Sequence, residues 1–271
     1  MAAVDVNGVR IEYEVTGRGR PVVLLHGFPD SGRLWRHQVP ALAEAGFQVI
    51  VPDLRGYGRS DKPEGVEAYN LMSLAGDVIA VLGDVGVDRA HVVGHDWGAA
   101  LAWGMASLAP ATVDHLAVLS VGHPATFRRT FKQREKSWYM LLFQFPGIAE
   151  RWLSEDDWAN FRNWAGHPDT NQVIADLESN GSLTPALNWY RANVPPESYL
   201  LSGLRLPPVQ APTMGVWSSG DFALTEGQMT RSAGAVAGPW RYERIDGPGH
   251  WMQLEAPDAV NRLLIDFLPA T

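Results

Sequence analysis

The stretch that decides the fold is His91-Val92-Val93-Gly94-His95-Asp96-Trp97-Gly98-Ala99-Ala100-Leu101-Ala102. A short apolar run is followed by a turn between two glycines and then by small residues, which indicates a buried strand, a sharp turn and a helix. The turn fits the pattern Gly-x-nucleophile-x-Gly, in which strand and helix come too close for Cβ atoms. We therefore predict that Asp96 is presented at the end of a central strand as a nucleophile.

Further strands are predicted on both sides of this stretch. An Asn-Gly pair within residues 4–11 indicates a hairpin. Short apolar runs without alternation are typical of strands buried on both faces, and they lie at 22–25, 48–51, 91–93, 116–119 and 213–217, with a less regular one at 241–245. Helical patterns lie between most of them, at about 34–45, 72–85 and 97–109. This alternation predicts an α/β fold, with a mostly parallel sheet and helices on both of its faces.

The succession of predicted strands stops after Pro124 and resumes after residue 207. The stretch between is rich in Trp, Tyr, Phe and Arg at helical spacing, and we interpret it as a helical cap inserted into the sheet domain. The predicted organisation is therefore a core domain of residues 1–124 and 208–271 and a cap of residues 125–207.

Composition excludes several classes of function. The chain of 271 residues has a formal net charge of −8 and no dense basic stripe, so we expect no nucleic-acid partner. It has no cysteine, which rules out disulfides, thiolate metal ligands and a cysteine nucleophile. Neither a signal peptide nor a membrane-spanning run is visible, so we expect a cytoplasmic protein that does not enter the membrane.

The identity of the nucleophile predicts the kind of substrate. A carboxylate is ionised at neutral pH, with an ordinary pKa of ~3.9, so Asp96 needs no base to activate it. A serine that attacked a saturated carbon would form an ether, which water does not cleave. A carboxylate forms an ester, which water does cleave. An Asp at this turn therefore indicates alkyl electrophiles, such as epoxides or alkyl halides, rather than carboxylic esters.

Hydrolysis of such an ester needs a general base and a group that orients it. We predict His250, in a glycine-rich loop, as the base and Asp221, which follows the predicted strand ending at Trp217, as its partner. Two other loop acids, Asp246 and Asp84, remain alternatives to Asp221, although neither follows a core strand so directly.

The oxyanion that develops on the ester needs N–H donors. We expect the backbone amides of Phe28, in His26-Gly27-Phe28-Pro29, and of Trp97 to supply them. The glycines of segment 53–60 precede no helix of a nucleotide-binding unit, so we interpret that segment as a structural loop. The histidines show no spacing typical of metal ligands, and we expect neither a metal nor a cofactor.

Four of these segments resemble the epoxide hydrolases of the α/β-hydrolase fold, and the resemblance extends over nearly the whole chain. They are His26-Gly27-Phe28-Pro29, Gly94-His95-Asp96-Trp97-Gly98, Gly220-Asp221-Phe222 and Gly249-His250-Trp251. The resemblance implies an eight-stranded sheet with a helical lid. It also implies conversion of an apolar epoxide to a vicinal diol, a hydrolase reaction on an ether bond, through an ester on Asp96.

Two segments of the predicted cap sharpen the resemblance. Residues 138–147 and 187–191 look like the two segments from which that family contributes tyrosine hydroxyls to the epoxide oxygen, which implies Tyr139 and Tyr190 here. A tyrosine, with an ordinary pKa of ~10, can donate such a hydrogen bond while un-ionised. We expect the substrate pocket to be lined by His26, Pro29, Trp189, Phe222 and Trp251.

Two alternatives remain. A haloalkane dehalogenase would share the aspartate turn and the tryptophan that follows it, but those enzymes often have a halide-binding Asn where this chain has Phe28. A non-catalytic ligand-binding member of the fold would need a damaged triad, whereas all three members are present. A homodimer is left open.

Overall fold

The computed structural model describes residues 2–126, 130–199 and 206–270. Its centre is one eight-stranded sheet with the strand order β1-β2-β4-β3-β5-β6-β7-β8. The strands are β1 (Ala2–Val6), β2 (Val9–Gly17), β3 (Arg20–Leu25), β4 (Phe47–Pro52), β5 (Ala90–His95), β6 (Val113–Leu119), β7 (Thr213–Ser218) and β8 (Trp240–Ile245). The predicted α/β fold with a mostly parallel sheet is confirmed, since only the β1–β2 and β2–β4 pairs are antiparallel.

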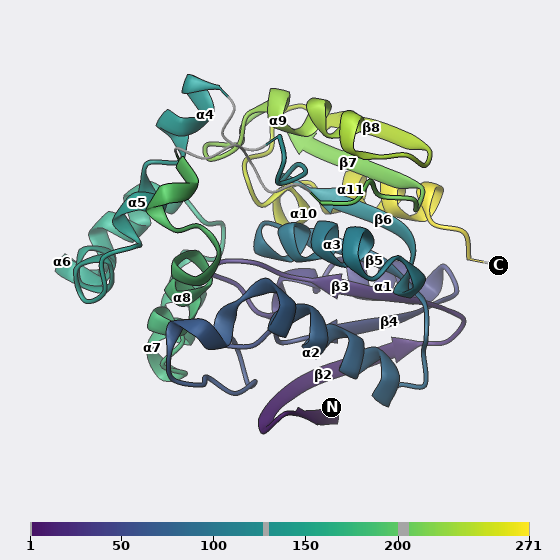
Figure 1. The fold of residues 1–271 in the computed structure, drawn as a ribbon, viewed down its shortest axis with the longest axis horizontal. Helices are drawn as coiled ribbons and strands as arrows, with labels where there is room; N and C mark the ends of the chain where they lie inside the picture. The colour runs from purple at the N-terminus through teal and green to yellow at the C-terminus, as the bar shows by residue number, and fades with distance from the viewer. Residues whose placement is uncertain (1, 127–129, 200–205, 271) are drawn as a thin grey trace.

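Helices cover both faces of the sheet. In Figure 1, α2 (Leu71–Asp84) and α3 (Trp97–Leu108) lie in front of it, and α1 (Gln38–Glu44) and α11 (Pro257–Phe267) lie behind it. Outside the segment between β6 and β7, the shorter elements of the described chain are η1 (Gly32–Trp35), η2 (Val66–Tyr69), η3 (Pro110–Thr112), α9 (Glu226–Thr230), η5 (Arg231–Ala235) and α10 (Met252–Glu255).

The single helix expected over residues 34–45 is wrong in its boundaries. The segment forms η1 and then a new helix, α1, that begins at Gln38. A continuous helix would have needed an N–H at Pro40, which proline lacks. Restarting the helix places Pro40 in the first turn, where proline is tolerated.

Between β6 and β7 the described residues form helices and no strand. They are α4 (Phe131–Lys136), α5 (Tyr139–Leu142), α6 (Ile148–Ala165), α7 (Thr170–Ser179), α8 (Leu183–Asn193) and η4 (Pro196–Tyr199). Helix α6 is interrupted by non-helical backbone at 155–158. Figure 1 places α4–α8 together beyond one end of the sheet. The predicted cap of 125–207 includes residues 127–129 and 200–205, which lie outside the described residues.

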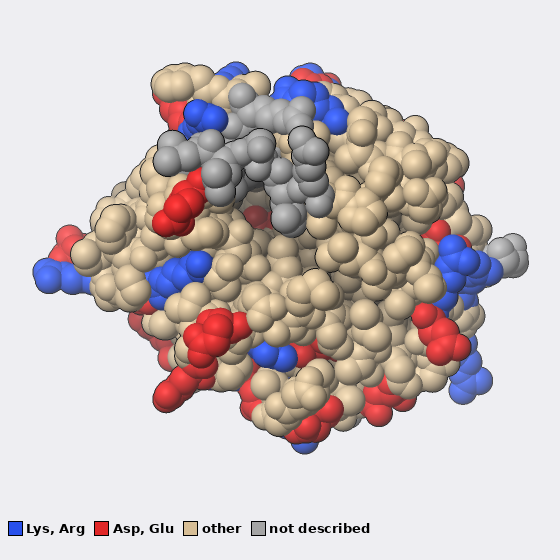
Figure 2. All heavy atoms as spheres, in the orientation of Figure 1, with Lys and Arg blue, Asp and Glu red and all other residues tan. Residues whose placement is uncertain are grey.

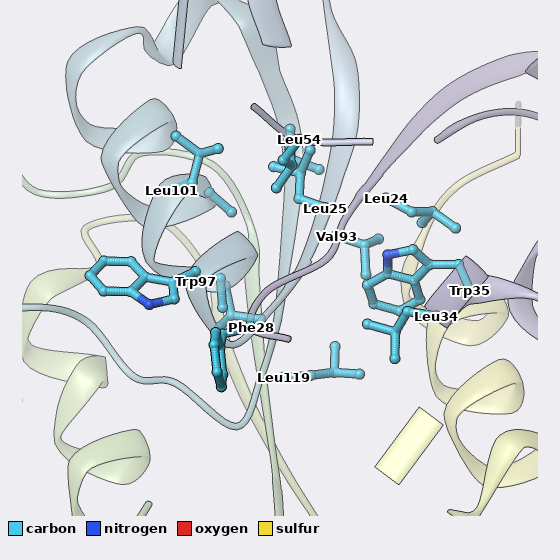
Figure 3. Close-up of a cluster of buried hydrophobic side chains, with 14 of the residues drawn as sticks. Leu24, Leu25, Phe28, Leu34, Trp35, Leu54, Val93, Trp97, Leu101 and Leu119 are labelled. Atoms are coloured by element: carbon cyan, nitrogen blue, oxygen red, sulfur yellow. The ribbon is translucent and has the colours of Figure 1, made fainter. Parts of the chain in front are cut away.

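The hydrophobic core joins the central strands to the segments that carry the candidate site. Figure 3 shows Leu24 and Leu25 of β3 and Val93 of β5 in one buried cluster with Phe28 and Trp97. Fully burying an apolar side chain of this size contributes roughly 1.5–3 kcal/mol. The loop after β3 and the start of α3 are therefore fixed by the core itself.

The described surface carries both signs of charge. Figure 2 shows a face that is largely uncharged in its middle, with acidic and basic side chains interspersed around its edge rather than gathered in a basic patch. None of the helices in the described part of the chain has the length and apolar character required to cross a membrane.

Candidate active site

The turn that carries Asp96 is as tight as the sequence predicts. Strand β5 ends at His95 and α3 begins at Trp97, so Asp96 alone connects them, with φ +52° and ψ −120°. A Cβ atom on Gly94 would collide with the backbone of Gly98, and one on Gly98 would collide with the carbonyl of Leu25. The two glycines let helix and strand meet, and the strained backbone of Asp96 holds its side chain at the carboxyl end of the sheet.

The Asp96 carboxylate lies among hydrogen-bond donors. Its Oδ1 accepts the backbone N–H of Phe28 at 2.8 Å, and its side chain is 12% exposed. It also sits at the N-terminus of α3, whose first N–H groups have no partner within the helix and whose dipole favours negative charge. The two amides predicted to bind an oxyanion, those of Phe28 and Trp97, thus both belong to the segments that surround this carboxylate.

His250 and Asp221 meet at this carboxylate. Nε2 of His250 lies 3.6 Å from Asp96 Oδ2, and Nδ1 lies 3.0 Å from Asp221 Oδ2. The other oxygen of Asp221 accepts the backbone N–H groups of Ala223 and Leu224, both at 2.8 Å. Because Asp221 is fixed on both sides, it can orient the imidazole with Nε2 toward Asp96.

Electrostatics at the site favour a charged His250 in the free protein. Burial by itself lowers the pKa of His250, but the charges and hydrogen bonds of Asp221 and Asp96 outweigh it and raise that pKa to about 10. Burial likewise raises the pKa of Asp221, and His250 with the two backbone N–H groups outweighs it, so the Asp221 pKa lies below its ordinary value. Near neutral pH, the site therefore holds an imidazolium between two carboxylates.

The backbone of His250 is anchored by two buried side chains that the sequence analysis did not single out. The His250 carbonyl accepts hydrogen bonds from His95 Nε2 at 2.9 Å and from Ser120 Oγ at 3.2 Å. Burial, followed by the charge of His250, lowers the pKa of His95 to about 4. His95 therefore stays neutral and keeps its N–H pointed at this carbonyl. Its position inside the elbow pattern was the available signal.

Tyr139 and Tyr190 come from different helices and lie together above the elbow. Their ring centroids are 6.1 Å apart, and the Tyr190 ring lies 5.0 Å from Trp97 and 5.7 Å from Phe28. Both tyrosines are almost completely buried. Burial first, and then the charge of Asp96, raises the pKa of Tyr190 well above its ordinary value. The Tyr190 hydroxyl is therefore un-ionised, and it lies close enough to the candidate nucleophile Asp96 to be affected by its charge.

Of the predicted pocket residues, His26 and Trp189 make fixed polar contacts. His26 is fully buried, and its Nε2 accepts the N–H of Leu54 at 2.9 Å. The Trp189 indole donates to the carbonyl of Arg55 at 3.0 Å and its ring lies 5.9 Å from that of Trp97. These two side chains tie together the loops below the tyrosines.

Phe222, Trp251 and Pro29 occupy different surroundings. The Phe222 ring lies 5.8 Å from His250 and is stacked at 6.0 Å on Trp251, so both border the histidine. Pro29 instead lines a small hollow beside α7, and Asp96 is not among its lining residues. Phe222 and Trp251 thus lie beside His250, whereas Pro29 lies beside α7.

Asp30 and His167 form a buried pair that the sequence analysis missed. Asp30 Oδ1 lies 3.2 Å from His167 Nε2, and Oδ2 accepts the Trp251 indole N–H at 3.0 Å. This cluster joins the loop after β3, the α6–α7 connection and the residue after His250. Asp30 directly follows His26-Gly27-Phe28-Pro29, which was a usable signal, whereas His167 lies 137 residues away and carried none.

Segment 53–60 is the hydrogen-bonded loop that was predicted. Arg55 makes two hydrogen bonds to the Asp77 carboxylate, at 2.8 and 2.6 Å, and both side chains are buried. The Arg55 carbonyl accepts a hydrogen bond from the Trp189 indole N–H. The ion pair therefore also helps to hold the part of α8 that carries Trp189 and Tyr190.

Comparison with known proteins gives one consistent result. The family model described as the alpha/beta hydrolase fold matches residues 20–257. The chain is 36% identical to epoxide hydrolase A of Mycobacterium tuberculosis, covering 98% of this chain and 96% of that protein.

Solved structures agree with this. The chain resembles epoxide hydrolase A of Mycobacterium thermoresistibile, with a TM-score of 0.82 and 32% identity over 98% of this chain and 97% of that one. It also resembles a Bacillus megaterium epoxide hydrolase variant complexed with its product (R)-3-[1]naphthyloxy-propane-1,2-diol, with a TM-score of 0.86 and 27% identity over 98% and 99%.

Proposed function

The chain belongs to the α/β-hydrolase-fold epoxide hydrolases, and from this membership we propose that it adds water to an apolar epoxide and releases a vicinal diol. The observation that carries the proposal is an aspartate at the nucleophile turn, within reach of a histidine–aspartate pair and beneath two buried tyrosines. A carboxylate in that place suits substitution at a saturated carbon, because the resulting ester can be hydrolysed.

In the first step, Asp96 attacks one carbon of the oxirane. The carbon–oxygen bond of the ring breaks, and its electron pair stays on the oxygen. Tyr139 and Tyr190 donate hydrogen bonds to this developing alkoxide. Because Oδ1 of Asp96 is held by the Phe28 N–H, Oδ2 is the oxygen free to form the bond.

The charge on His250 then changes in the direction that the second step requires. Ester formation removes the negative charge of Asp96, which is one of the two charges that raise the His250 pKa. The imidazolium becomes a stronger acid, and its proton can pass to the alkoxide to give the alcohol. A neutral His250, still oriented by Asp221, remains as a general base.

In the second step, His250 takes a proton from water, and the oxygen of that water attacks the ester carbonyl. The amides of Phe28 and Trp97 bind the oxyanion of the tetrahedral intermediate. Collapse of the intermediate breaks the bond between the ester carbon and the alkoxide oxygen, and the proton left on the water-derived hydroxyl passes to that oxygen. This releases the diol, regenerates the Asp96 carboxylate and leaves the other water proton on His250. The charges and protons of the free enzyme are thereby restored, and one oxygen of Asp96 now comes from water.

We further propose that α4–α8 act as the cap over this site and that the substrate is apolar. Aromatic rings surround the elbow from both sides, and Tyr139, Phe143, Trp164 and Tyr190 form a continuous set of ring contacts. Such a lining favours a substrate with an aromatic or alkyl substituent. The naphthyloxy diol bound by the Bacillus megaterium enzyme is a product of that kind.

The experiment that tests the proposal is interception of the ester. The variant His250→Gln should still open the ring but should not hydrolyse the ester. Mass spectrometry after incubation with a terminal aryl epoxide should therefore find one covalent adduct, located on Asp96. The variant Asp96→Asn should give no adduct, and His37→Gln, which changes an exposed histidine, should turn over like the wild type. A folded His250→Gln protein without an adduct would contradict the mechanism.

Turnover by the wild-type protein distinguishes the alternative reaction. Terminal epoxides and bromoalkanes are supplied in parallel, and diol and bromide are measured. Diol without bromide supports the proposal, whereas bromide without diol indicates a dehalogenase.

A further inference from the structure

A cluster of three side chains lies at the opposite end of the sheet from Asp96. Ala90 pairs with Val113, but Val92 pairs with Leu116, so β6 has one residue more than β5 across this interval. This β-bulge places Asp114 and His115 together opposite His91. Bulges of this kind commonly re-aim side chains at functional positions.

The ring of His91 is held in an orientation in which one nitrogen has no hydrogen-bond partner among the described residues. Its Nε2 donates to the carbonyl of Pro269 at 3.0 Å, and the side chain is completely buried. In the neutral ring, Nδ1 therefore carries a lone pair, which faces Asp114 Oδ2 at 3.6 Å, an atom that can only accept. Within the described residues, Nδ1 of His91 and Nδ1 of His115 have no hydrogen-bond partner.

The three side chains have the donor types of a metal site and lie close together. Nδ1 of His115 lies 3.7 Å from Asp114 Oδ1, and the candidate ligand atoms all lie within 4.8 Å of one another. Zinc bonds of 2.0–2.2 Å place tetrahedral ligand atoms roughly 3.3 Å apart. His91 faces Oδ2 of Asp114 and His115 faces Oδ1, so the carboxylate would rotate and the ligand atoms would draw together by up to about 1.5 Å to reach this spacing.

We propose that His91, Asp114 and His115 form an auxiliary site for a divalent transition-metal ion. Two imidazoles and one carboxylate suit zinc, and a water molecule would complete the tetrahedron. The hydrogen bond from His91 Nε2 to a backbone carbonyl is the outer contact that typically orients a metal-binding histidine.

Neighbouring charges set the strength of this site. Arg20 contacts Asp114 Oδ2 at 2.5 Å and Arg89 lies 3.5 Å from Oδ1, so a bound ion shares the carboxylate with two cations. Both arginine side chains are largely exposed and can turn toward solvent. The competition lowers the affinity, and we expect binding in the micromolar rather than the picomolar range.

The site stands apart from the proposed chemistry and fixes the end of the chain. The residues of β5 between His91 and Asp96 span about 17 Å at the rise of a strand. The ring of Phe267 packs on His115, and Pro269 holds His91, so the segment after α11 closes over the cluster. In Figure 1 the C-terminus lies at the end of the sheet remote from α4–α8. A bound ion should therefore raise thermal stability without changing turnover.

The test uses the whole protein, dialysed against a chelator and titrated with Zn²⁺ by calorimetry. We expect one equivalent of Zn²⁺ to bind, to be removed by EDTA and to raise the melting temperature. His115→Gln and Asp114→Asn change partly exposed residues and should fold, as circular dichroism can check; each should weaken binding at least tenfold. His37→Gln should not weaken it.

One variant separates this cluster from the active site, where histidines and carboxylates could also hold zinc. His250→Gln should retain the binding and the melting-temperature increase. Loss of binding in His250→Gln, unchanged affinity in both His115→Gln and Asp114→Asn, or no EDTA-reversible binding by the wild-type protein would each overturn the proposal.

Discussion

Replacing Tyr190 by Phe should slow the opening of the epoxide ring and little else. The ring of Tyr190 packs at 5.0 Å against both Trp97 and Phe143 and at 5.7 Å against Phe28. Phenylalanine keeps these contacts and leaves no cavity, so the stability should change by only about 1 kcal/mol. The hydroxyl alone is lost.

The size of the effect follows from what that hydroxyl donates to. A hydrogen bond to a charged group contributes roughly 1.5–3 kcal/mol, and each 1.36 kcal/mol corresponds to tenfold in rate. Ring opening should therefore slow roughly 10- to 160-fold in Tyr190→Phe. Tyr139→Phe should behave similarly. The double variant should lose at least the product of the two, because no second donor remains to compensate.

Single-turnover experiments measure this step directly. Enzyme in excess is mixed with an aryl epoxide, quenched at intervals and analysed for modified Asp96, with the change in tryptophan fluorescence followed in parallel. Tyr242→Phe is the matched control, since its hydroxyl donates to Glu226 at 2.8 Å, away from the site. A double variant that modifies Asp96 within a few-fold of the wild-type rate would refute the role given to the two hydroxyls.

Three further changes have definite expected outcomes. Asp77→Asn leaves the buried Arg55 charge without its partner and should cost about 3–5 kcal/mol, seen as a lower urea midpoint; an unchanged midpoint would contradict this. Gly98→Ala drives a Cβ into the Leu25 carbonyl and should destabilise the fold by roughly 3 kcal/mol, so a wild-type melting temperature would show that the elbow can relax. His250 has a pKa that burial lowers but Asp221 and Asp96 raise to about 10. It therefore adds stability that is complete below its unfolded pKa of about 6.5 and is lost as the pH rises toward 10, and Asp96→Asn should flatten this decline in denaturation midpoints.

The parts of the fold that could be predicted from sequence are those with a local signal. Buried strands such as β3 and β7 appear as short apolar runs, and α3 is marked at both ends by the elbow and by Pro110. The helix over 34–45 was misjudged because its apolar periodicity continues across a proline that the backbone cannot accommodate. The bulge in β6 had no visible signal, because an extra residue is defined only by the strand beside it.

The candidate site also contains residues with a local sequence signal and residues without one. Asp96 and His250 lie in short patterns whose glycines reveal the backbone geometry, and the structure places them 3.6 Å apart. The Asp30–His167 pair and the His91–Asp114–His115 cluster are contacts between separate elements, and neither residue type nor spacing along the chain indicates them. The sequence could thus predict which single residues lie at the end of the central strand, but not these contacts between separate elements.

The hydrogen bond from the Phe28 amide to one oxygen of Asp96 makes the two carboxylate oxygens unequal, and isotopes can reveal this. In heavy-oxygen water, the first diol should carry only light oxygen, because its new hydroxyl comes from the protein, while the solvent atom stays on the aspartate. If the amide prevents the carboxylate from flipping between cycles, that atom takes the attacking position, and the new hydroxyl of every second-turnover diol should carry the heavy isotope. With a freely rotating carboxylate, only half of these diol molecules would carry it.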